Sequence, residues 1–62
     1  MSFAKSLEKR MKEKNITKAE LARRIDVADT TVGRYVSGKM RPRRLLLNRI
    51  LDVLDCSEED LR

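Results

Sequence analysis

Apolar residues recur at helical spacing along most of this chain, and no segment alternates apolar and polar residues as a strand does. Near the N-terminus, Phe3, Leu7 and Met11 follow one another at intervals of four, which predicts an amphipathic helix ending near Asn15. A later stretch, "RRLLLNRILDVLD", repeats the spacing after Pro42, a residue suited to the first turn of a helix. Its apolar positions are Leu47, Ile50, Leu51 and Leu54. We expect this later helix, the fourth in chain order, to lie at the centre of the core.

Two shorter helices and a final turn complete the pattern. Thr17 and Glu20 have the spacing of a capping box, in which the hydroxyl caps the first turn and the carboxylate returns the bond. That helix should run for about nine residues, because "DVAD" interrupts the periodicity. A third helix, with Val32, Tyr35 and Val36 inward, should stop at Ser37 and Gly38, where glycine can adopt the left-handed conformation. Ser57 and Asp60 repeat a weaker capping signal, so we predict one all-α domain of five helices over residues 1–62.

Charge narrows the class of partner. The 62 residues carry a net charge of +5, and residues 1–44 hold 13 Lys and Arg against 5 Asp and Glu, whereas residues 45–62 hold 2 against 5. This asymmetry indicates a polyanionic partner, either nucleic acid or an anionic membrane. The first helix has Phe3 as its only aromatic residue, which favours a solvated charged face over a membrane anchor. No apolar run approaches the roughly 20 residues that cross a bilayer, so we expect no membrane partner.

The chain lacks the residue combinations that hydrolytic and metal-dependent catalysis use. The chain has no histidine and one cysteine, Cys56, which offers no base, metal-ligand spacing or second thiol. Two glycines are too few for a phosphate-binding glycine loop, and short acidic groups at helix starts are typical of caps. We therefore expect no enzyme activity, no cofactor and no small-molecule ligand. We also expect a reducing, cytoplasmic location, and Cys56 as a buried small apolar residue.

The stretch "TKAELARRIDVADTTVGRYVSGKMRP" resembles the helix-turn-helix of the lambdoid phage repressor and Cro family. The positions that match its inward residues are Leu21, Ala22, Ile25, Val27, Val32 and Tyr35. The likeness extends from Phe3 to Leu61 and implies a bundle of the lambda-repressor type, with the helix-turn-helix formed by the second and third helices. It also implies a repressor or Cro-like regulator that binds a palindromic operator as a weak homodimer. The alternative is a protein-interaction module, such as an antitoxin component.

Three departures from the family pattern affect this reading. Asp26 stands where the family usually has glycine, as does Asp55, although aspartate tolerates left-handed geometry better than most residues. Ala28 stands where a hydroxyl usually caps the third helix, so Asp29 could cap instead and shift the helix start by one residue.

Leu45 and its neighbour Leu46 exceed what one apolar stripe needs. Either the fourth helix is buried on two faces or one face meets a second subunit.

The resemblance assigns roles in binding double-stranded DNA to individual residues. In a helix-turn-helix, the later of the two helices, here the third helix of the chain, lies in the major groove with its N-terminal part on base edges. The expected base-reading residues are Asp29, Thr30, Thr31, Gly33 and Arg34. Arginine can pair with guanine, threonine can meet a thymine methyl, and aspartate could accept from cytosine unless it caps the helix. The expected phosphate-binding residues are Thr17, Lys18, Ser37, Lys39, Arg41 and Arg43. The glycine at position 33 either permits close approach to DNA or has no special role.

Overall fold

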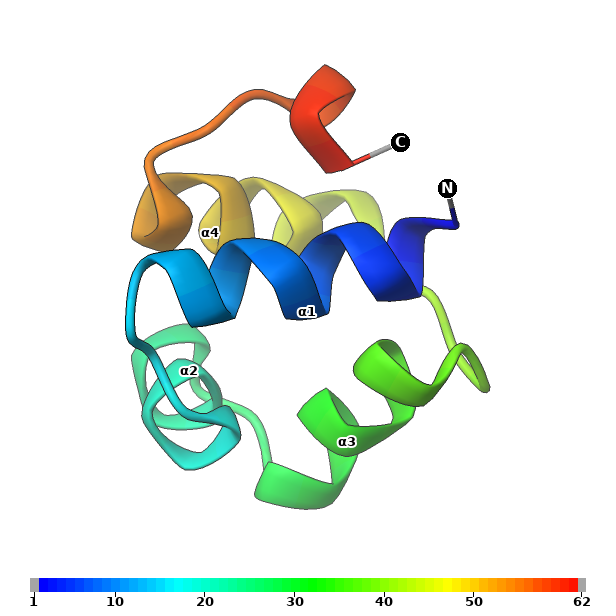
Figure 1. Cartoon of the computed structure of the whole chain (residues 1–62). Coiled ribbons are helices and arrows are strands. Elements are labelled where there is room, and N and C mark those ends of the chain that lie inside the picture. The colour runs from blue at the N-terminus through cyan, green and yellow to red at the C-terminus, as the bar shows by residue number, and fades with distance from the viewer. Residues whose placement is uncertain (1, 62) are drawn as a thin grey trace.

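The computed structural model describes residues 2–61, and over this range the protein is helical without strands. Its elements are α1 (Phe3–Glu13), α2 (Lys18–Ile25), α3 (Asp29–Ser37), α4 (Arg44–Leu54) and the 3-10 helix η1 (Glu58–Leu61). The predicted all-α class is confirmed. The described residues contain four α-helices, and the expected fifth helix is a single 3-10 turn. In Figure 1, α1 and α4 lie on one side of the molecule and α2 and α3 on the other.

Side-chain caps fix where the first two helices begin. Ser2 Oγ accepts a hydrogen bond from Lys5 N at 3.3 Å, and Thr17 Oγ1 accepts one from Glu20 N at 3.1 Å. The hydroxyl bond of the predicted capping box is therefore confirmed. The predicted return bond from the Glu20 carboxylate is wrong, because this carboxylate pairs with Arg24 one turn later, at 2.9 Å.

Left-handed residues end three of the helices. Asp26 has φ 63° after α2, Gly38 has φ 83° after α3, and Asp55 has φ 52° after α4. Both aspartates thus take the left-handed geometry expected where the family usually has glycine. Asn15, just beyond α1, also has positive φ, at 60°. Short polar side chains tolerate this conformation, so the turns form without extra glycines.

Two helix starts differ from expectation. Ala28 is the N-cap of α3 and makes no side-chain cap bond. Asp29 is the first helical residue, so the alternative in which Asp29 caps the helix is wrong. Helix α4 begins at Arg44, after Arg43 in extended geometry. Pro42 therefore lies outside the first turn of α4, because the chain stays extended beyond it.

The core is one cluster contributed by every helix. Its buried apolar side chains are Leu7, Met11, Leu21, Ala22, Ile25, Val32, Tyr35, Leu47, Ile50, Leu54 and Leu61. Helix α1 packs on α3 and η1, and α4 packs on α2. Leu46 is half-buried against the core, whereas Leu45 is 63% exposed. Of the two alternatives for α4, burial on two faces is therefore only partly realised, and contact of one face with a second subunit stays a prediction. Cys56 is only partly buried, and this burial raises the pKa of its thiol.

Candidate nucleic-acid interface

Helices α2 and α3 are held together by a short, tightly bonded turn. Val27 N donates to Ala22 O at 2.9 Å, which folds the chain back at the left-handed Asp26. Ala22 is 1% exposed, and a small residue at this position lets two helices approach closely. The opposing side of α3 contributes Val32 and Tyr35, both buried. The relative orientation of α2 and α3 is therefore fixed by packing and does not depend on a partner.

Helix α3 presents a polar outer face opposite its buried residues. Asp29, Thr30 and Arg34 are exposed, and Thr31 and Gly33 are half-buried. The structure brings all five expected base-reading residues onto this one helix of nine residues. Within residues 2–61, their side chains make no hydrogen bond or ion pair. Their polar groups are therefore available to an external partner.

Gly33 has open space beside it. A Cβ atom added at this position would meet no other residue of the protein within 4 Å. Its backbone is helical, unlike that of Gly38, which has φ 83° at the end of the same helix. Packing within the protein therefore does not require glycine at position 33. In a helix interior, glycine is less favourable than alanine by roughly 0.5–1 kcal/mol.

The expected phosphate-binding residues lie at both ends of the α2–α3 unit. Thr17 and Lys18 are at the start of α2, and both are exposed. Because the Thr17 hydroxyl oxygen accepts the bond from Glu20 N, its proton remains available to donate outward. Ser37 is also exposed, but its hydroxyl donates to Arg34 O at 3.2 Å within α3. Ser37 would have to turn away from that carbonyl to donate to a phosphate.

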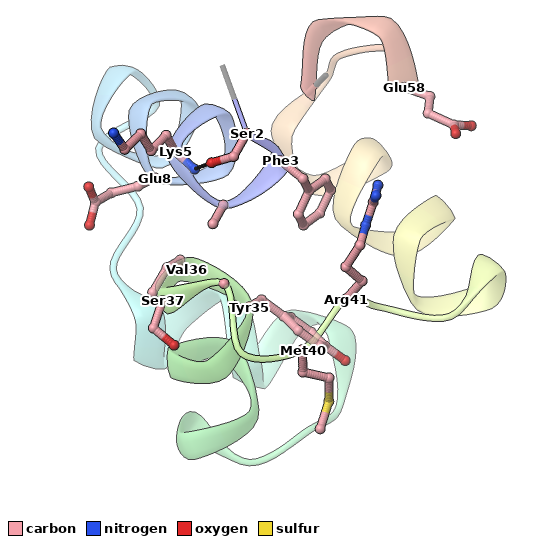
Figure 2. A pocket seen from close by; sticks show the side chains of 12 residues that line it. Ser2, Phe3, Lys5, Glu8, Tyr35, Val36, Ser37, Met40, Arg41 and Glu58 are labelled. Carbon is pink, nitrogen blue, oxygen red and sulfur yellow. Dashed lines mark hydrogen bonds between the residues drawn. The ribbon is translucent and has the colours of Figure 1, made fainter.

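The loop between α3 and α4, residues 38–43, is tied back to the protein in two ways. Lys39 N and Met40 N both donate to Arg34 O, at 3.0 and 3.3 Å. The Arg41 guanidinium lies over the Phe3 ring, 5.1 Å from its centroid, as Figure 2 shows. This cation–π contact attaches the loop to the start of α1. Lys39 and Arg43 are exposed and make no ion pair with any residue from 2 to 61.

Figure 2 shows an open groove between this loop, the end of α3 and the start of α1. Its walls mix apolar side chains with groups of both charges: Lys5 and Arg41 are cationic, and Glu8 and Glu58 are anionic. Such a lining favours no single class of charged ligand. The groove therefore provides no reason to add a small molecule to the partners.

Two further arginines, besides Arg41, have structural partners that the sequence did not indicate. Residues 39–44 form a basic stretch whose cations are Lys39, Arg41, Arg43 and Arg44. Arg44 donates from Nη1 to Glu58 Oε1 at 2.6 Å. Arg49 donates from Nη1 to Ile25 O at 3.3 Å and so satisfies a carbonyl at the end of α2. These pairs lie 14 and 24 residues apart, beyond the range of any helical period. The only sequence signal was the presence of arginines on helices expected to pack.

Comparison with known proteins decides the family. A family model described as the Cro/C1-type HTH DNA-binding domain matches residues 6–62. The chain belongs to this family. The resemblance to lambdoid repressors and Cro is thereby confirmed, and the Cro/C1-type domain is a DNA-binding domain of transcription regulators. No curated protein and no solved structure matches the chain. Among residues 2–61 of this Cro/C1-type domain, no helix combines the length and the apolar composition that a bilayer span requires.

Proposed function

We propose that this Cro/C1-type domain is a sequence-specific transcriptional regulator, a repressor or Cro-like protein, in which α2 and α3 form the helix-turn-helix. The observation that carries the proposal is the outer face of α3, whose five polar or small residues have no side-chain partner within residues 2–61. The family assigns DNA as the partner. A helix of this kind enters the major groove, and its partner helix crosses the backbone.

The roles within α3 follow from side-chain chemistry. Arg34 carries the largest share of base discrimination, because its fork of donors matches the O6 and N7 acceptors of guanine. Thr30 and Thr31 contact bases near the N-terminus of the helix, where a thymine methyl suits their own methyl groups. Asp29 accepts from cytosine N4, a role supported by its position as an exposed first helical residue that does not cap the helix.

Cations around α3 hold this helix in register on the DNA backbone. Lys18, Lys39 and Arg43 supply charge from the start of α2 and from the loop, and each is exposed. The phosphate contacts from Thr17 and Ser37 are hydroxyl contacts. Arg41 remains over the Phe3 ring. The N–H groups on the far side of its guanidinium face the phosphates of the DNA. Such contacts contribute affinity that is independent of sequence and falls with salt.

Two copies of the domain bind one operator. A single α3 covers one half-site, so a palindromic operator requires a dimer with half-sites roughly 34 Å apart. Support for a second subunit comes from Leu45, which is 63% exposed at the start of α4. A face this small favours a weak dimer that assembles on DNA. Such a regulator would act in the cytoplasm of a bacterium or of a phage-infected host.

Selection of bound sites from random DNA tests the proposal. The expected result is a palindrome, with binding that weakens steeply as salt is raised. Recovery of no preferred sequence, together with a stoichiometric complex with another protein, would refute the proposal and identify an interaction module of the antitoxin kind.

A further inference from the structure

The acidic C-terminal turn engages one cation of the basic stretch inside the protein. Arg44 Nη1 lies 2.6 Å from Glu58 Oε1, a short charge-assisted hydrogen bond. Arg44 is the first residue of α4 and directly follows Arg43, one of the proposed phosphate-binding residues. We propose that Arg44 is a phosphate-binding residue whose charge is masked. In the free protein, the Glu58 carboxylate binds the Arg44 guanidinium at the place where a DNA phosphate would otherwise bind. This inference rests on the proposed DNA-binding function.

Exchange between the two anions is chemically simple. Carboxylate and phosphate oxygens present similar acceptors to the planar guanidinium, and both can bind it through two N–H groups. The side chains of Arg44 and Glu58 are 68% and 39% exposed, so water and salt screen their pair. Exposed pairs of this kind contribute little to stability. A phosphate can take the place of Glu58 only by releasing that carboxylate, which then takes up a cation from solution. Glu58 therefore lowers the affinity for DNA of any sequence and offsets the counterion that the phosphate releases.

Glu58 is held near Arg44 by contacts that do not involve Arg44. Leu61, at the end of η1, is 1% exposed and belongs to the core. Asp60 accepts from Ser57 N at 2.9 Å and lies 3.7 Å from Arg10 on α1. Because these contacts anchor η1, neutralising Glu58 should leave the turn in place. The effect on DNA binding can then be measured on an intact fold.

The test compares Glu58→Gln with Glu59→Gln in the full chain. Both substitutions remove one negative charge, but Glu59 is exposed and makes no ion pair within residues 2–61. The probe is a fluorescent duplex of random sequence, titrated at several salt concentrations. At low salt, Glu58→Gln should bind about two- to five-fold more tightly than Glu59→Gln, the range set by the small strength of an exposed ion pair. Its log–log salt slope should steepen by about 0.9, the contribution of one phosphate contact.

A second variant assigns the effect to Arg44. Adding Arg44→Gln to Glu58→Gln should return the salt slope to that of the unmodified protein. Equal slopes for Glu58→Gln and Glu59→Gln would overturn the masking proposal while leaving DNA binding intact. A lower melting temperature for Glu58→Gln with an unchanged slope would likewise overturn it, because the pair would then be a structural anchor. Failure of every form, including the unmodified protein, to bind DNA would instead overturn the proposed function and this inference with it.

Discussion

Gly33→Ala separates the needs of the folded domain from those of its DNA complex. The added Cβ would meet no residue of the protein within 4 Å, and position 33 has helical backbone. Alanine should therefore stabilise the free domain by roughly 0.5–1 kcal/mol, because glycine loses more conformational freedom in a helix. For a domain of this size, about 1 kcal/mol moves the melting temperature by roughly 4–8 °C. We expect a rise of about 2–8 °C in a thermal melt followed by circular dichroism.

The same methyl group should weaken binding to the operator. If α3 lies in the major groove with Gly33 against the DNA, the methyl enters a packed interface, where overfilling costs about 1–3 kcal/mol. This corresponds to a loss of about 5- to 150-fold in affinity, measured by fluorescence anisotropy with the selected operator. Stability and affinity should thus change in opposite directions. A merely destabilising substitution cannot produce that result.

Asn48→Ala is the matched control. Asn48 is exposed in the interior of α4, a helix that Figure 1 shows on the opposite side of the molecule from α3, and alanine there should also raise helix stability by a few tenths of a kcal/mol or more. Its DNA affinity should not change. Unchanged operator affinity for Gly33→Ala would refute close approach of α3 to DNA at this position. A lower melting temperature would show that the reasoning about open space beside Gly33 is wrong.

Three further predictions concern the interface and the C-terminal turn. Arg34→Ala should relax preference at one operator position per half-site, at a cost of about 1–3 kcal/mol, in a repeated site selection; a uniform loss across sequences would make Arg34 a phosphate contact. Lys39→Gln should weaken specific and random DNA alike and reduce the salt slope by about 1, whereas Lys9→Gln, on α1, should leave the slope unchanged. Hydrogen bonds from Ser57, with help from a nearby arginine, hold the pKa of Asp60 below its ordinary value of 3.8. The resulting stabilisation of the folded domain is complete above pH 3.8 and is lost as the pH falls through the lower pKa of the folded state. Asp60→Asn should therefore flatten the fall of melting temperature at acidic pH. An unchanged dependence of melting temperature on pH would contradict the assignment.

The sequence by itself determined the fold class, the approximate positions of the helices and the family. These features are local. A stripe such as Phe3, Leu7 and Met11 specifies a buried helix face wherever the helix packs, and Thr17 caps the turn that follows it. Gly38 ends α3 because a left-handed residue is needed there. Each signal lies within one or two helical turns, so it can be seen without knowledge of the rest of the chain.

The local signals were weaker where two caps competed or where a long side chain had a choice of partner. Ala28 precedes α3 although alanine is a poor cap, because packing of the turn after α2 fixes where the helix starts. The Glu20 carboxylate pairs with Arg24 although the capping box offers it a backbone N–H. Both options were compatible with the sequence, and their energies differ by amounts too small for a pattern to rank.

Only the tertiary structure decided which of the basic residues are free. Arg41 lies over Phe3, Arg44 meets Glu58 and Arg49 caps the end of α2, whereas Lys39 makes no ion pair within residues 2–61. A guanidinium on a long, flexible stem binds whichever acceptor or ring the packing brings within reach. Those partners come from distant parts of the chain, and their approach depends on how the helices stack around the core. The charge of the chain was thus a property of its sequence, but the charge available to DNA is a property of its fold.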